Sequence, residues 1–306
     1  MHLFSRALLL LAALSSAPKA DACDVCGTSA SNPSLGLLPQ FSKNFAGIQF
    51  QYSSAESKHP SLFTGKPDEE SHQTYATTLL WGRYHIARRF QIAGILPYIN
   101  NVNAETAQTT NSEGLGDATL MVNYSFPLKE GKKEKQLLLA GAGLKLPTGK
   151  YTGASNAERN GLPNVQTGSG SWDILMNINY TCKKAKWGYN LDLTGILTRP
   201  NKQQYKFGNR LNTNAVIFYT TGSKSFKIIP QAGLRCEYAL HDYDNYSKRW
   251  LNEKTGGTMG FASIGTQLLF KSYGIKANLH LPFYQNYAAG YVHSNPRYEG
   301  GFFILF

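Results

Sequence analysis

Charged residues are scarce in this chain: of its 306 residues, only 16% are Asp, Glu, Lys or Arg, whereas about a quarter is typical of soluble domains. Long apolar runs are also missing. The run Ala7–Leu14 is too short to span a bilayer, and no other run approaches the roughly 20 residues of a membrane helix. The mean hydropathy is nevertheless polar. These absences exclude a helical membrane protein, argue against an ordinary soluble enzyme, and favour β-rich folds in which apolar and polar residues alternate.

Glycine and aromatic residues are abundant instead, with 29 Gly, 18 Tyr and 16 Phe. The net charge of +12 is compatible with a nucleic-acid or acidic-membrane partner. However, the basic residues are dispersed among predicted turns and are not gathered with aromatic residues on one face; examples are Lys132, Lys133, Lys183, Lys184 and Lys186. The sequence therefore predicts no nucleic-acid partner, and the basic charge by itself says little about a substrate.

Residues 1–22 have the features of a secretory signal peptide. Arg6 precedes a short apolar stretch, and Ala20-Asp21-Ala22 forms a cleavage motif. We therefore expect an exported protein whose mature chain begins with a periplasmic segment over residues 23–43.

Two cysteines, Cys23 and Cys26, stand at the start of that segment and are followed by Gly27, so the haem-attachment motif CxxCH is absent. In an oxidising compartment the pair favours a disulfide. A site for a soft metal such as copper or zinc would need further ligands that this segment lacks, and lipid attachment at Cys23 is a third alternative. Cys182 and Cys236 are expected to be free. No cofactor is predicted.

From residue 44 onward, polar and apolar residues alternate in segments of about ten residues. In 118–126 the even positions, such as Leu120 and Val122, are apolar, and the odd positions are mostly polar. A period of two makes a strand with one apolar and one polar face. Twelve such segments are predicted, at 44–55, 72–85, 88–100, 115–127, 135–147, 168–182, 186–199, 205–221, 224–241, 257–270, 272–284 and 297–306.

The connections between these segments alternate in length. Tight turns alternate with long polar connections, which are expected at 56–71, 101–114, 148–167, 242–256 and 285–296. An outer-membrane β-barrel has this arrangement, because its periplasmic turns are short and its external loops are long. The sequence thus predicts an all-β fold: a transmembrane antiparallel β-barrel of about 12 strands over residues 44–306, with both termini periplasmic.

Aromatic residues near the predicted strand ends fit the two interfacial girdles of such a barrel. They are Tyr52, Tyr84, Tyr98, Tyr124, Trp172, Tyr180, Trp187, Tyr219, Tyr238, Phe270, Tyr273 and Phe283. The last predicted strand ends in Phe306, like the C-terminal strand that the outer-membrane assembly machinery reads. The expected location is the outer membrane of a Gram-negative cell, with outer-membrane lipid and that machinery as partners.

Three motifs carry a family resemblance: Gly114-Leu115-Gly116-Asp117, Lys145-Leu146-Pro147-Thr148-Gly149, and the stretch TGSGSWD at 167–173. They resemble the outer-membrane transporter family named for the meta-pathway of phenol degradation. The segment Cys23-Asp24-Val25-Cys26-Gly27 looks like that of Bacteroidetes members of this family. The resemblance implies an outer-membrane barrel that passes small, hydrophobic or aromatic compounds, and it brings no catalytic residues. The glycines and the proline of the first two motifs also suit a structural role, where the chain enters or leaves a strand.

Charged residues opposite the apolar stripe are expected to face the lumen, because Lys or Arg facing lipid at mid-membrane would cost about 2–4 kcal/mol. These lumen-lining candidates are Arg83, Lys145, Asp173, Asp192, Arg210, Arg235, Glu237, Lys276, His280 and Glu299. Their mixed signs favour salt bridges inside a narrow barrel. Both a restricted pathway and a plugged barrel stay open at this point.

The predicted function is a channel or transporter for small solutes. The alternative is a non-conducting scaffold barrel whose loops or CxxC segment bind a partner or a metal. An enzyme is not predicted. His293-Ser294-Asn295 is superficially similar to the His-Ser pair of outer-membrane phospholipases, but it falls in a predicted external loop and no residue that would orient His293 can be identified.

Overall fold

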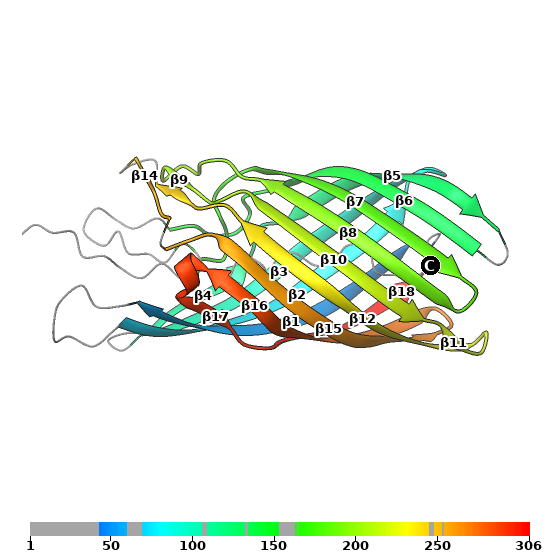
Figure 1. Ribbon diagram of the computed structural model, residues 1–306. Helices are drawn as coiled ribbons and strands as arrows, with labels where there is room; N and C mark the ends of the chain where they lie inside the picture. Colours follow the sequence, from blue (N-terminus) through cyan, green and yellow to red (C-terminus); the bar gives the residue numbers. More distant parts are fainter. Residues whose placement is uncertain are drawn as a thin grey trace, which may run out of the picture.

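The computed structural model describes residues 43–59, 69–105, 109–131, 134–152, 163, 165–244, 248–252 and 254–306. They form a closed antiparallel barrel of twelve strands, which confirms the predicted fold class (Figure 1). The predicted signal peptide and Cys23 and Cys26 lie outside the described residues. The barrel strands are β1 (Phe45–His59), β2 (Glu69–His85), β3 (Phe90–Glu105), β5 (Thr119–Glu130), β6 (Glu134–Lys145), β7 (Asp173–Lys184), β8 (Trp187–Leu197), β10 (Arg210–Tyr219), β12 (Phe226–Ala239), β15 (Gly257–Phe270), β16 (Tyr273–Tyr287) and β18 (Arg297–Leu305).

Each barrel strand pairs with the barrel strands before and after it in the chain. The barrel closes where β1 pairs with β18. Pairing is continuous over long stretches: β1 and β2 stay in register from Phe45↔Arg83 to His59↔Glu69. Closure pairs the backbone groups of both edges, which a sheet needs when it is surrounded by lipid.

The two ends of the barrel differ. At one end, short connections such as 86–89, 185–186 and 271–272 join the strands. The first and last barrel strands meet here, because the N–H of Asn44 donates to the carbonyl of Phe306 (3.1 Å). The long connections lie at the opposite end, on the left of Figure 1. We call them the short-turn end and the long-loop end.

At the long-loop end the sheet extends further than the sequence predicted. β1, β2 and β3 have 15, 17 and 16 residues, and β4 (Thr109–Leu115) pairs with the end of β3. The loops predicted at 56–71 and 101–114 are therefore wrong in part, because strands occupy both sides of each connection. These stretches are polar on both faces, so they lack the apolar stripe by which strands were predicted.

Smaller elements also lie at the long-loop end. β9 (Tyr205–Lys206), β13 (Tyr243–Asp244) and β14 (Arg249–Trp250) form a separate three-stranded sheet, and β17 (Val292–Ser294) pairs with β1. A 3₁₀ turn, η2 (Ala288–Gly290), precedes β17, and β11 (Thr221–Gly222) extends β12 at the short-turn end. Among the described residues, no helix is long and apolar enough to cross a membrane.

The single strand predicted at 205–221 is interrupted between β9 and β10. Gly208 lies directly against the carbonyl of Leu240, where a Cβ would not fit. The side chain of Asp242 accepts hydrogen bonds from the Gly208 N–H (2.7 Å) and the Tyr205 hydroxyl (2.5 Å). Burial raises the pKa of the Asp242 carboxyl, and these two donors act against that shift. The break in the strand therefore anchors the small sheet to the barrel.

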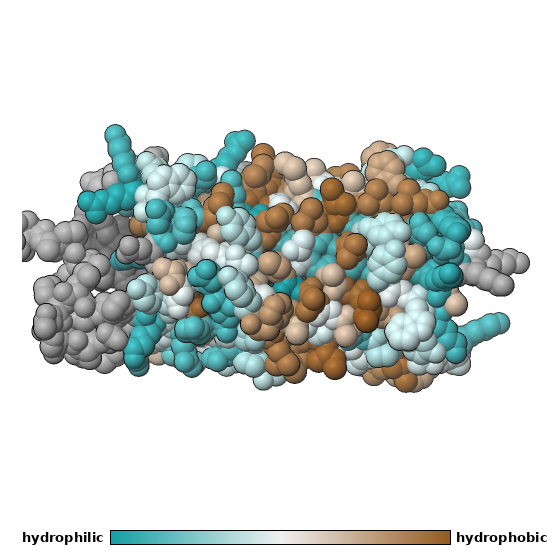
Figure 2. All heavy atoms as spheres, in the orientation of Figure 1, coloured by the Kyte–Doolittle hydropathy of each residue, from teal (hydrophilic) through white to brown (hydrophobic). Residues whose placement is uncertain are grey.

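The outer surface of the barrel is apolar around its middle, and the inner surface is largely polar. Outward side chains such as Leu120, Ile178 and Ile264 are more than half exposed, whereas inward ones such as Gln73 and Asn179 are buried. Figure 2 shows hydrophobic residues over the middle of the barrel and hydrophilic residues toward both ends. Many of the predicted girdle aromatics, Trp187 and Phe283 among them, are exposed on this surface, as the strand phase requires.

Candidate functional site

All ten charged candidates lie on inward positions of the barrel strands. Arg83, Asp173, Asp192, Arg235, Glu237, Lys276, His280 and Glu299 are buried, and Lys145 and Arg210 are half-buried. They do not form one cluster. The structure separates them into groups at different heights, and their role in solute passage stays a prediction.

The largest group, which we call the ion cluster, comprises Arg235, Glu237, His280, Arg297 and Glu299 on β12, β16 and β18. Arg297 donates to both carboxylate oxygens of Glu237 (3.0 Å each), and the Nε of Arg235 lies 2.7 Å from Glu237. The carboxylate of Glu299 lies 3.3 Å from His280 Nε2 and 3.8 Å from Arg235. Because each charge has an opposite neighbour, the cost of burying it is offset.

Arg297 is the member of the ion cluster that the sequence analysis missed. It stands two residues before Glu299 on the last strand and so shares its inward phase. The alternation of inward and outward positions in the predicted strand 297–306, followed back to its first residue, also places Arg297 inward. Its guanidinium also lies over the ring of Phe261, 4.1 Å from the centroid.

Two cavities beside the cluster measure about 20 Å³ each, which is space for a single water.

A network of amides and hydroxyls on the inner wall of β7 and β8 surrounds the carboxylate of Asp192. Asp192 accepts hydrogen bonds from Asn177 (3.1 Å) and Asn179 (2.8 Å). Asn190 donates to Asn179 (2.9 Å) and to Thr181 (2.7 Å). Of this network the sequence analysis named only Asp192, because it considered charged residues alone. The same alternation along the strands also places the uncharged residues Asn177, Asn179, Thr181 and Asn190 on the inward face.

Lys145 and Asp173 form an ion pair at the long-loop end of β6 and β7, with the Nζ 2.5 Å from the carboxylate. Asp117 of the GLGD motif lies 3.6 Å from the same Nζ. Its carboxylate also accepts hydrogen bonds from the Gly149 N–H (3.1 Å) and from the N–H and hydroxyl of Ser169 (2.8 and 2.6 Å). Asp117 thus connects the three motifs that carry the family resemblance.

Gly149 and Gly168 show why these motifs need glycine. A Cβ on either residue would approach the backbone of the other to 2.6 Å. The hydroxyl of Thr148 bonds to the carbonyl of Gly116 (2.7 Å) and accepts from the N–H of Ala118 (2.8 Å). These contacts give the motifs a structural role at the long-loop rim.

The other cationic candidates lie over aromatic rings. The Nζ of Lys276 is 4.5 Å from the centroid of Trp81, and the guanidinium of Arg83 is 5.3 Å from that of Phe45. Arg210 lies 5.9 Å from the ring of Phe207. Such cation–π contacts partly replace the water that a buried cation loses.

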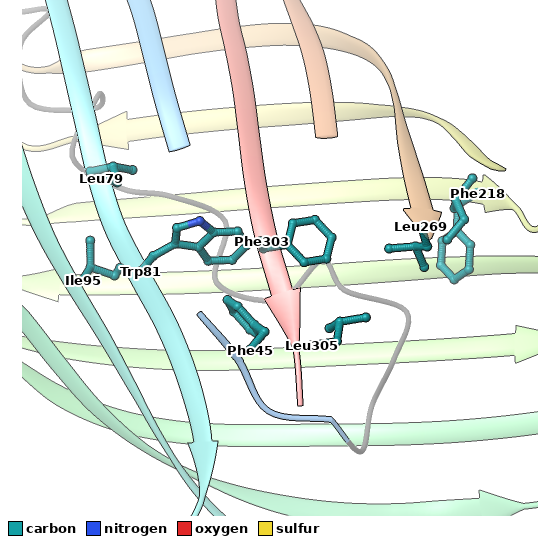
Figure 3. Packing of buried hydrophobic residues seen from close by; sticks show 9 residues of the cluster. Phe45, Leu79, Trp81, Ile95, Phe218, Leu269, Phe303 and Leu305 are labelled. Atoms are coloured by element: carbon teal, nitrogen blue, oxygen red, sulfur yellow. The ribbon is translucent and has the colours of Figure 1, made fainter. Parts of the chain in front are cut away.

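A cluster of buried apolar residues, which we call the apolar layer, packs inside the short-turn half of the barrel (Figure 3). The rings of Phe45 and Trp81 are 4.5 Å apart, and Phe303 lies 6.4 and 6.3 Å from them. The layer comprises Phe45, Leu79, Trp81, Ile95, Phe218, Ile229, Leu269, Phe303 and Leu305. On β12 the layer lies between the ion cluster and the short-turn end, because this strand presents Arg235, Ile229 and Lys227 inward in that order.

A cavity of about 1270 Å³ opens inside the short-turn end; we call it the vestibule. Ile229 and Leu269 belong both to its lining and to the apolar layer, which therefore forms its floor. Cationic lining residues outnumber acidic ones by seven to two: they are Lys43, Arg88, Arg89, Lys129, Lys135, Lys183 and Lys227, against Glu130 and Glu134. The lining makes this end of the barrel strongly basic.

His293 and Ser294 do not form a catalytic pair. They are neighbours on β17, so their side chains take opposite faces: His293 is exposed and Ser294 is buried. The Ser294 hydroxyl donates to the carbonyl of Asn295 (3.1 Å) and accepts from Arg297 (3.3 Å).

Cys182 and Cys236 are both free, as predicted. Within the described ranges, no three His, Cys, Asp or Glu side chains come together as metal ligands.

No family model and no curated protein matches the chain. Among solved structures, it is similar to an outer membrane channel from Pseudomonas putida F1, with a TM-score of 0.62 and 16% identity over 90% of this chain and 99% of that one. The translocator domain of the autotransporter NalP from Neisseria meningitidis has a TM-score of 0.41 and 12% identity, over 88% of this chain and 90% of that one. At 16% identity the likeness to the Pseudomonas putida channel shows the barrel fold and no more.

Proposed function

We propose that the protein is an outer-membrane channel or transporter for small solutes, with the short-turn end in the periplasm. The vestibule carries this proposal. A cavity of about 1270 Å³ that penetrates one end of the barrel is a space for solutes, and a barrel that served only as a scaffold would not need it. The apolar outer band and the polar interior support placement in a membrane.

The apolar layer acts as the constriction of the pathway. Layers of apolar side chains gate pores by excluding water, and a small displacement of their rings lets water and solute through. Phe45, Trp81 and Phe303 all come from β1, β2 and β18, so a movement at this one seam of the barrel would open the layer.

The same layer also favours the second candidate, a non-conducting scaffold barrel. Planar-bilayer recordings with the full-length protein and with Trp81→Ala distinguish the two. A channel is expected to conduct, and Trp81→Ala to conduct more, because the substitution removes the indole from the constriction. Trp187→Ala is the matched control, since Trp187 faces outward and is 61% exposed. If neither the wild type nor Trp81→Ala conducts, while both insert into the bilayer, the channel proposal fails.

A further inference from the structure

Among the described residues, three lysines of the vestibule lining form no ion pair, although the lining also holds Glu130 and Glu134. Lys135, Lys183 and Lys227 occupy inward positions at the short-turn ends of β6, β7 and β12. The neighbouring Lys129, by contrast, pairs with Glu134 (2.6 Å). These three residues are called the lysine triad below.

The triad is unfavourable for the folded protein by itself. Lys135 and Lys183 stand directly opposite each other in the β6–β7 register, and like charges in that position destabilise a sheet. Glu130 stands opposite Lys135 on the other side, in the β5–β6 register, so the repulsion falls mainly on Lys183 and Lys227. Lys183 is half-buried, and the charges of both Lys227 and Lys135 act on it. An anion between the ammonium groups would offset this repulsion.

The surface next to the triad is apolar. Lys227 is two residues from Ile229 on β12 and lies opposite Leu269 of β15 in the register, and both apolar residues form the floor of the vestibule. A ligand that fits this surface has a negative group for the triad and an apolar body for the floor.

We propose that the vestibule binds small organic anions, namely carboxylates with a short apolar body, and that the lysine triad recognises the carboxylate. This inference rests on the proposed function, because it assigns the solute class of the same pathway. The vestibule is concave and of a size that encloses a small molecule. A bound carboxylate faces the triad while its tail lies on the apolar layer, which places it at the constriction that it would cross.

Equilibrium binding of hexanoate to the detergent-solubilised full-length protein tests the proposal, with calorimetry as the readout and 1-hexanol as the neutral probe of the same length. We expect hexanoate to bind, and the triple variant Lys135→Gln, Lys183→Gln and Lys227→Gln to bind it at least about tenfold more weakly. The triple exchange of the same residues to Arg keeps the charge and is expected to retain binding.

The matched control replaces Lys184, Lys224 and Lys271 by Gln. These three lysines are exposed at the same end of the barrel and do not line the vestibule, so hexanoate affinity should stay within about twofold of the wild type. Absence of hexanoate binding, equal binding in the triad variant, or equally strong binding of 1-hexanol would each overturn the proposal.

Bilayer recordings on the same preparations keep the two proposals apart. If the protein conducts but hexanoate binding does not depend on the triad, the channel proposal holds and the carboxylate-site proposal is wrong. If hexanoate binding depends on the triad but no variant conducts, the carboxylate-site proposal holds and the channel proposal is wrong.

Discussion

Charged side chains are arranged in opposite ways in the ion cluster and in the vestibule. In the ion cluster, Arg297 and Arg235 both contact Glu237, and Glu299 lies between His280 and Arg235. In the vestibule no member of the lysine triad forms an ion pair among the described residues, although Glu130 stands opposite Lys135 in the β5–β6 register. The two groups share strand β12, on which Ile229 of the apolar layer lies between Arg235 and Lys227.

This difference follows from access to water. Charges in the narrow interior must be paired, since an isolated buried charge is costly. In the vestibule, water screens the lysines and unpaired cations are tolerated. A predominantly basic lining in such a place suits a ligand of the opposite sign, whereas the balanced ion cluster forms a structural network. The substitutions below test this contrast.

The largest effect is expected from Glu237→Ala. The substitution leaves both Arg235 and Arg297 without their shared carboxylate, and breaking a buried pair in this way costs about 3–5 kcal/mol. Guanidinium titration of the protein in lipid vesicles, followed by tryptophan fluorescence, measures the free energy of unfolding. An unchanged unfolding midpoint would show that the ion cluster is hydrated and that the contrast with the vestibule does not hold.

A smaller loss is expected from Asp117→Ala, which removes the acceptor shared by Gly149 and Ser169. Hydrogen bonds to a charged group contribute about 1.5–3 kcal/mol. The same titration measures the effect, and Asp117→Asn, which keeps one carbonyl oxygen, should lose less. Equal stability of the Ala variant and the wild type would contradict the structural role assigned to the three motifs.

The smallest effect has the opposite sign. Lys183→Gln removes a repulsion with Lys135 and should stabilise the barrel by about 0.2–1 kcal/mol in low salt. Lys184→Gln is the control, because Lys184 lies opposite Glu134 in the same register and its loss should stabilise nothing. If Lys183→Gln destabilises the protein instead, Lys183 has a structural partner and the triad is not a free cationic site.

The barrel could be predicted from sequence because its signals are local. The alternation of polar and apolar residues in 118–126 or 273–281, and the short turns between strands, can each be recognised within about a dozen residues. Lipid contacts only the outer side of the barrel, so the apolar face of each strand points outward. The hairpins above β1–β2 and β3–β4 lack that apolar stripe, since water surrounds them on both faces, so they were predicted as loops.

The site was predicted less completely than the barrel. The alternation along each strand predicted that the charged residues face inward. It did not predict which residues on other strands they contact, and Arg297 was missed. The lysines appeared dispersed, because Lys135, Lys183 and Lys227 belong to three different strands. Only the closed ring of strands, with β12 joined to β10, brings Lys227 near Lys183. Part of the basic charge thus lies in the vestibule, where we propose that it binds carboxylates.

The reversal potential of the full-length protein in a planar bilayer under a KCl gradient tests most directly the central claim, which joins the proposed channel to the proposed anion site. We expect a current that is selective for anions, and a reversal potential that moves toward zero when the lysine triad is replaced by Gln. A current selective for cations, or a bilayer that contains the folded protein and carries no current at any voltage, would contradict an anion-conducting pathway through this barrel.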